Sequence, residues 1–212
     1  MMFALIRREL GLAPRQGAVL PLIFMLLVAT LYPFAVGPDG ALLARTGGGV
    51  IWIAALLAAL LPIDRLIAPD FAEGVIDQLM LRGVTAELLA AAKIVAHWLS
   101  FGPLLMLAAV PAAALLRMDG EILLRLELGL LLGTPALAAL GVLVASLTAG
   151  LPRSGALAGL LLLPLAIPVL IFGAGALGGD PSAIKLLAAA ALFICAVAPF
   201  GAGAALRVAV ES

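Results

Sequence analysis

Six long apolar stretches dominate this sequence of 212 residues. Their approximate bounds are 18–36, 48–63, 94–116, 128–149, 155–178 and 183–206. A helix needs about 20 apolar residues to cross the hydrocarbon core of a bilayer. Hydrophobic residues make up 65% of the chain and charged residues only 11%, whereas soluble domains carry about 25% charged residues. We therefore predict an all-α membrane protein, a single domain over residues 1–212 with six transmembrane helices.

The charges are few, balanced and dispersed. Twelve basic and twelve acidic residues give a formal net charge of zero, and no basic run occurs. Nucleic-acid binding is therefore excluded as a function class, because it requires a basic surface. The single cysteine, Cys195, excludes an intrachain disulfide.

The basic residues also predict the orientation, because lysine and arginine near span ends favour the cytoplasm. With the N-terminus inside, eight basic residues lie in the cytoplasm and four outside. The inside set is Arg7, Arg8, Arg15, Arg65, Arg82, Lys93, Arg153 and Arg207. The outside set is Arg45, Arg117, Arg125 and Lys185. We expect both termini in the cytoplasm.

Residues 2–12 precede the first span and mix apolar side chains with Arg7, Arg8 and Glu9. This pattern fits a short helix in the headgroup plane, the elbow helix of a transporter subunit. A plain positive flank is the alternative. Between the spans, Gly129 and Gly133, and likewise Gly155 and Gly159, have the spacing that lets helices approach closely within lipid.

The connection between the second and third spans, residues 69–93, is much longer than the other loops. Over about 70–82 its carboxylates recur at helical spacing opposite an apolar face, which predicts an amphipathic helix outside the membrane. The acidic side consists of Asp70, Glu73 and Asp77. The apolar side consists of Phe71, Ala72, Val75, Ile76, Leu79 and Met80. Gly83 ends this helix, and Thr85 can cap the next one.

An acidic helix does not suit an anionic leaflet, which attracts lysine and arginine. We interpret it as a coupling helix that inserts into a groove of a separate ATPase subunit, as in ATP-driven exporters. Ile76, Leu79 and Met80 would be the apolar anchors, rimmed by Asp70, Glu73 and Asp77. The alternative is that the helix folds back on its own spans.

The chain lacks the residues to hydrolyse ATP itself. A P-loop requires GxxxxGK[ST], yet Lys93 follows alanines and Lys185 precedes leucine, and there is no other lysine. The ATPase must be supplied in trans, so we expect a non-catalytic subunit.

Five segments, in this order, resemble one family over most of the chain. They are LLPIDRLIAPDFAEGVIDQLMLRG (60–83), AKIVAHWLSFGPLL (92–105), LLLGTPALAALG (130–141), LPLAIPVLIFGAGA (163–176) and VAPFGAGAALR (197–207). On these segments the sequence resembles the haem exporter protein B (CcmB) family, the membrane subunit of the cytochrome c maturation ABC transporter. The resemblance implies an ABC-2-type permease-like bundle in the bacterial inner membrane.

The resemblance also implies partners and a cargo. The partners would be a CcmA-like ATPase, CcmC-like and CcmD-like membrane proteins and, indirectly, a CcmE-like haem chaperone. ATP hydrolysis would drive haem export or release of the haem-loaded chaperone. Haem would be a handled ligand and not a firmly bound cofactor. Only Trp52 and Trp98 are present, which agrees with a coupling role, because haem in that complex is handled chiefly by the tryptophan-rich CcmC.

Three further residues are candidate functional residues. His97, the only histidine, lies about one turn inside the third span. Haem ligation, a structural or coupling hydrogen bond and proton transfer are its alternative roles. Asp64 and Arg65 end the second span. They would form a mutual ion pair, contact headgroups, or hold the coupling helix in register.

Two other function classes fit the sequence less well. A secondary transporter usually needs ionisable groups near the bilayer midplane, and no Asp, Glu, Lys or Arg lies deep in a predicted span. An intramembrane enzyme would need a catalytic partner for His97, and the spans offer neither a GxSG serine nor paired aspartates. Within the exporter class, the alternative is an ABC-2-type permease for another lipid or drug cargo.

Overall fold

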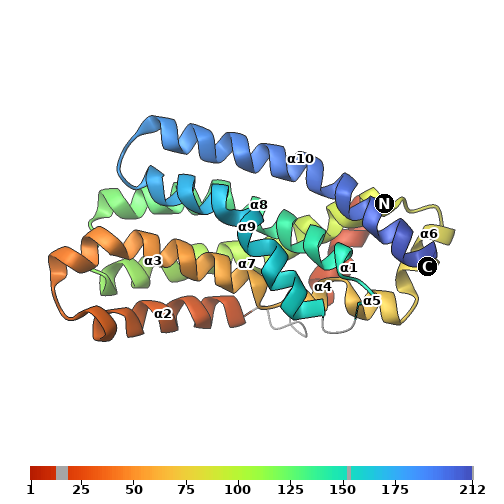
Figure 1. The fold of residues 1–212 in the computed structure, drawn as a ribbon, viewed down its shortest axis with the longest axis horizontal. Coiled ribbons are helices and arrows are strands. Elements are labelled where there is room, and N and C mark those ends of the chain that lie inside the picture. The colour runs from red at the N-terminus through yellow and green to blue at the C-terminus, as the bar shows by residue number, and fades with distance from the viewer. Residues whose placement is uncertain (13–18, 152–153, 212) are drawn as a thin grey trace.

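The computed structural model describes residues 1–12, 19–151 and 154–211, and within these ranges it is built from helices without a strand (Figure 1). The helices are α1 Met2–Leu12, α2 Leu20–Val36, α3 Gly40–Leu60, α4 Ile63–Leu66, α5 Ala68–Ala72, α6 Val75–Leu81, α7 Ala86–Leu115, α8 Gly120–Leu147, α9 Ser154–Ala176 and α10 Pro181–Glu211.

Five of these helices, α3, α7, α8, α9 and α10, are long and apolar enough to cross a membrane. The sixth predicted span corresponds to α2, which is apolar but has only 17 residues; residue 18, at its predicted start, lies outside the described part. All six run along the long axis of the molecule (Figure 1). The prediction of an all-α membrane protein is confirmed.

Several helices begin earlier than the apolar stretches suggest. α3 starts at Gly40 instead of residue 48, and α8 starts at Gly120 instead of 128. Each is preceded by an aspartate cap: Asp39 accepts hydrogen bonds from the amides of Ala41 and Leu42, and Asp119 accepts one from Ile122. Such caps extend a helix beyond its apolar part, because they satisfy amides that lack an intrahelical partner.

Both chain termini lie at one end of the bundle, together with α1, α4, α5 and α6 (Figure 1). We call this the terminal end. The α2–α3, α7–α8 and α9–α10 connections lie at the opposite end. The two termini therefore lie at the same end of the bundle, and their cytoplasmic location stays a prediction.

α8 is the central helix of the bundle and packs against α3, α4, α7, α9 and α10. The indole of Trp52, from α3, is buried against Gly129 and Gly133 of α8 and Gly173 of α9. A Cβ atom at Gly133 or Gly173 would lie 2.6 or 2.4 Å from the indole. The predicted packing role of the first glycine pair is therefore confirmed.

The second glycine pair behaves differently. A Cβ atom at Gly159 would meet nothing within 4 Å, so its expected role in close packing is wrong. The surroundings of Gly155 lie outside the described part of the chain. Spacing alone does not distinguish a glycine at a helix contact from one at the bundle surface.

The predicted coupling helix 70–82 is not continuous. It is divided into α5 and α6 at Gly74, whose φ of 66° lies in the left-handed region that glycine enters without a Cβ penalty. The second boundary is as expected: Gly83 has a φ of 84°, and the Thr85 hydroxyl accepts a 3.3 Å hydrogen bond from the Leu88 amide. The N-cap prediction for Thr85 is confirmed.

Candidate functional site: an ion cluster under the α4–α6 segment

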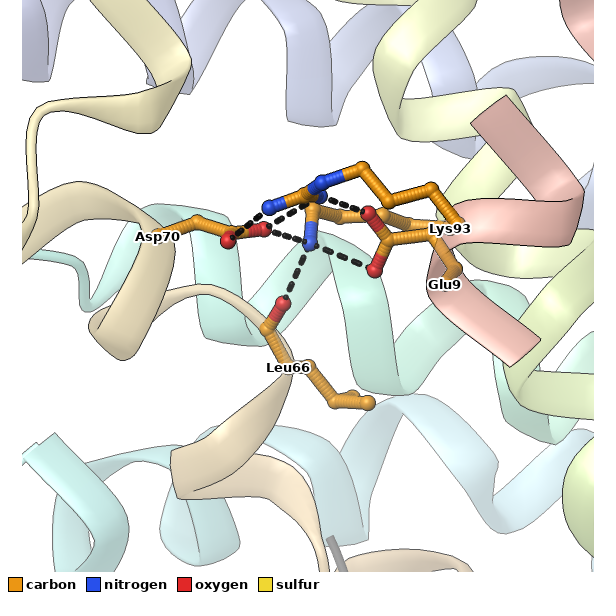
Figure 2. Close-up of polar contacts among 5 residues, drawn as sticks. Glu9, Leu66, Asp70 and Lys93 are labelled. Carbon is orange, nitrogen blue, oxygen red and sulfur yellow. Dashed lines mark hydrogen bonds and ion pairs between the residues drawn. The ribbon is translucent and has the colours of Figure 1, made fainter. Parts of the chain in front are cut away.

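A buried lysine lies at the centre of the terminal end. Lys93 is in the third turn of α7, among alanines, and is only 3% exposed. Its ammonium nitrogen Nζ donates to Glu9 Oε2 at 2.9 Å, Asp70 Oδ2 at 2.5 Å and the Leu66 carbonyl at 2.9 Å (Figure 2). Since an ammonium has three N–H groups, every donor of Lys93 is used.

The backbone partner of Lys93 follows from the shortness of α4. A helix leaves its last four carbonyls without intrahelical partners, and α4 has only four residues. The Leu66 carbonyl, at its end, accepts from Lys93 instead. α5 then begins with Ala68 and Pro69 and carries Asp70 in its first turn toward the same ammonium group.

A second cation completes the group. Arg8 of α1 donates through Nη2 to Asp70 Oδ1 at 2.6 Å and through Nη1 to Asp70 Oδ2 at 3.2 Å. Arg8 Nη1 also pairs with Glu9 Oε1. We call Arg8, Glu9, Asp70 and Lys93 the ion cluster. Its formal charge is zero, and three of its four members are buried.

The electrostatics of the cluster keep Asp70 ionised. Burial acts to raise the pKa of Asp70, but hydrogen bonds from Arg8 and the positive charge of Lys93 outweigh it, and the pKa is lowered from 3.8. The hydrogen bond to Asp70 is the largest cause that raises the pKa of Arg8. Arg8 and Asp70 therefore stay charged near neutral pH, and the ion cluster ties α1, α5 and α7 together.

The carboxylates predicted to share one face are separated by this arrangement. Asp70 points inward and is 7% exposed, whereas Glu73 and Asp77 are exposed and make no ion pair with any described residue. The break at Gly74 explains the separation, because a continuous helix would keep all three together. Asp70 is thus not free to contact a partner protein in this structure.

The predicted apolar anchors also face the bundle. Ile76 is fully buried within the chain, and Leu79 and Met80 are half-buried against the core. For Ile76, the alternative is correct: the helix folds back on its own spans. The large apolar side chain that α6 exposes is Leu81, which is 88% exposed.

Asp64 and Arg65 are both exposed near the start of this segment. Neither forms an ion pair with the other or with a further residue in the described ranges, so the predicted mutual ion pair is wrong. Asp70 holds the segment against the bundle instead. A headgroup contact for these two side chains stays a prediction.

His97 lies one helical turn after Lys93 and is 5% exposed. Its ring contacts Phe101, with ring centroids 4.7 Å apart, and its Nε2 faces Gly141 of α8. Nε2 has no hydrogen-bond partner among the described residues. A ligand as large as haem could reach this nitrogen only if the helices separated, so the closed bundle does not offer His97 as a haem ligand.

Arg8, Glu9 and Lys93 belong to the ion cluster, although the sequence predicts Arg8 and Lys93 only as cytoplasmic basic residues and Glu9 only as part of the N-terminal helix. One signal was available: Lys93 lies within AAAKIVAH, and a lysine so close to apolar helix residues requires an anionic partner. The sequence alone does not identify that partner, because Glu9 is 84 residues away in the chain.

This structure defines a class: an all-α multi-pass membrane protein with a short helical segment held to one end of its bundle by buried ion pairs. Among the described residues there is no group of three or more His, Cys, Asp or Glu side chains able to hold a metal ion. A family model described as CcmB protein matches residues 1–209. The chain belongs to the CcmB family.

Curated relatives agree with this assignment. Heme exporter protein B of Paracoccus denitrificans (strain Pd 1222) is 47% identical over 98% of this chain and 99% of the relative. The protein of the same name from Haemophilus influenzae is 44% identical over 98% of each chain, and that from Escherichia coli K12 is 40% identical over 100% of each. The family resemblance predicted from the sequence is confirmed.

Proposed function

We propose that this chain is the membrane subunit of an ABC transporter complex for cytochrome c maturation, and that its α5–α6 segment binds a separate, CcmA-like ATPase. The name heme exporter protein B, carried by its relatives, supports haem as the handled cargo. The complex would lie in the bacterial inner membrane with both termini in the cytoplasm. CcmC-like and CcmD-like proteins would be its membrane partners, and a CcmE-like chaperone would receive the haem.

The observation that carries the ATPase assignment is the exposed side of α6. Leu81 stands out from the terminal end, and Glu73 and Asp77 are exposed in the same segment. Leu81 offers an apolar anchor, with two exposed carboxylates earlier in the segment and the exposed Arg82 directly after it. A mixed surface of this kind suits a protein groove with an apolar floor and polar edges. The two carboxylates are poorly suited to an anionic membrane, so a protein groove is the better partner.

The buried side of α6 serves the same function. Ile76 is fully buried, and Leu79 and Met80 pack against the core. Force applied to the exposed side of α6 is therefore transmitted to the transmembrane helices. Asp70, Ile76, Leu79 and Met80 act in this proposal on the bundle side, while Glu73, Asp77 and Leu81 act on the ATPase side.

Purification of the tagged chain in mild detergent tests this function. We expect recovery with a small ATPase and with CcmC-like and CcmD-like proteins. We also expect a deletion strain to lose haem-stained c-type cytochromes. Recovery with an ATPase alone, together with normal cytochromes in the deletion strain, would favour a lipid or drug cargo. Recovery without any ATPase would contradict the proposal.

A further inference from the structure

The ion cluster connects the proposed ATPase-binding segment to two other helices at once. Asp70 belongs to α5, Glu9 and Arg8 belong to α1, and Lys93 belongs to α7. Figure 2 shows the side chains of Asp70 and Glu9 converging on the Lys93 ammonium group from opposite sides. We propose that Glu9, Asp70 and Lys93 form a joint through which movement of α5–α6 is transmitted to α1 and α7 together. This inference rests on the proposed function.

The joint is stiff because its ion pairs and hydrogen bonds are buried, so water cannot replace them individually. Glu9 and Lys93 are 7% and 3% exposed, and all three Lys93 donors are engaged. Pulling Asp70 away would leave a buried ammonium short of an anion, which is costly in a low-dielectric environment. α5 and Lys93 should therefore move as one body.

α1 should move together with α5 and Lys93 for two reasons. It packs along α7, and Arg8 and Glu9 attach it to the same cluster as Asp70. The N-terminal helix is thus a moving part of the transmission. In this view, Glu9 and Lys93 are positioning residues that contact neither the ATPase nor the cargo.

A different ion pair at the same end provides a matched control. Glu87, in the first turn of α7, pairs with Arg207 of α10, and both side chains are substantially exposed at 28% and 45%. Exposed pairs are solvated and contribute little rigidity. Removing the Glu87 charge should leave the transmission intact.

Distances between spin labels, measured by double electron–electron resonance on the complete complex, test whether the joint transmits movement. Spin labels are attached at Phe3→Cys of α1, Gln78→Cys of α6 and Leu147→Cys of α8 in a Cys195→Ser background. The three labelled side chains are exposed, and α8 is the central helix and serves as reference. The 78–147 and 3–147 distances are compared with and without ATP plus vanadate.

With the cluster intact, we expect both distances to change when nucleotide binds. In Asp70→Ala, and in the milder Asp70→Asn, the 78–147 change should persist while the 3–147 change is lost. Glu87→Gln should retain both changes. A purely structural role for Asp70 would alter the yield of the complex without separating the two distances.

Two results would overturn the inference alone. One is a 3–147 distance that stays constant in the parent complex while the 78–147 distance changes. The other is a 3–147 change that survives in Asp70→Ala. If the 78–147 distance does not change in a complex that hydrolyses ATP, the proposed function itself fails, and the joint fails with it.

Discussion

Lys93 Nζ lies 2.5 Å from Asp70 Oδ2, and this contact attaches the short α5 helix to the long helix α7. Both partners are buried, and their opposite charges are balanced further by Glu9 and Arg8. The segment that faces a partner in the proposed complex is therefore anchored by charge as well as by apolar packing.

Lys93→Met should destabilise the protein strongly. The substitution breaks the buried ion pairs of Glu9 and Asp70 with Lys93 and leaves the half-buried Arg8 as the cation that they still share. Removing one partner of a buried ion pair typically costs about 3–5 kcal/mol. The free energy of unfolding in mixed micelles, measured by titration with a denaturing detergent, checks this. Glu87→Gln breaks the exposed pair with Arg207 and should cost less than about 1 kcal/mol. Equal losses in the two variants would mean that the cluster does not stabilise the fold.

The contribution of Asp70 should persist well below neutral pH. Its pKa in the folded protein lies below 3.8. A carboxyl with a lowered folded pKa contributes stability above its unfolded pKa and loses it as the pH falls through the folded pKa. The stability difference between the natural protein and Asp70→Asn should thus be equal at about pH 7 and pH 5.5 and shrink only below about pH 4. A difference that vanishes by about pH 6 would contradict the ion-pair assignment.

Gly173→Ala should destabilise the bundle. Its new Cβ atom would lie 2.4 Å from the ring of Trp52, which is buried against glycines of α8 and α9. Overpacking of this kind costs about 1–3 kcal/mol. Gly159→Ala in the same helix is the control, because nothing lies within 4 Å of its added Cβ atom. Thermal unfolding in detergent should lower the Tm of the first variant only; equal Tm values would argue against tight packing around Trp52.

Two substitutions in α6 should differ in their effect on the yield of folded protein. Ile76→Asp places a carboxylate at a fully buried position, so the yield of folded monodisperse protein should fall severalfold, since burying an unpaired charge costs several kcal/mol. Leu81→Asp changes an exposed side chain and should leave that yield unchanged. Size-exclusion chromatography of fluorescently tagged protein separates the outcomes. A normal yield for Ile76→Asp would mean that α6 does not pack against the bundle.

Local patterns predicted much of this fold. The apolar stretches locate the long helices because the length needed to cross a bilayer is fixed, and the Thr85 cap is readable because a helix N-cap depends on neighbouring residues alone. The starts of α3 at Gly40 and of α8 at Gly120 lie before the apolar stretches, because the caps Asp39 and Asp119 extend these helices beyond their apolar part.

The site was harder to predict because its contacts are distant in sequence. The spacing of Asp70, Glu73 and Asp77 fits one face of a continuous helix. The left-handed conformation of Gly74 breaks that helix and turns Asp70 away from the other two carboxylates. Glu9 meets Lys93 across 84 residues, a contact that depends on how α1 packs along α7. Periodicity identifies a segment, but tertiary packing decides which of its faces is free.

The amount of ATPase subunit retained by an α6 surface variant tests the central claim most directly. The tagged chain carrying Asp77→Lys and Leu81→Asp is purified from membranes in mild detergent, and bound ATPase is quantified per mole of chain beside the natural protein. Both side chains are exposed, so the membrane level of the variant should be normal. We predict that most of the ATPase is lost while the membrane-protein partners remain. Full retention of the ATPase by this variant would contradict the coupling function of α5–α6.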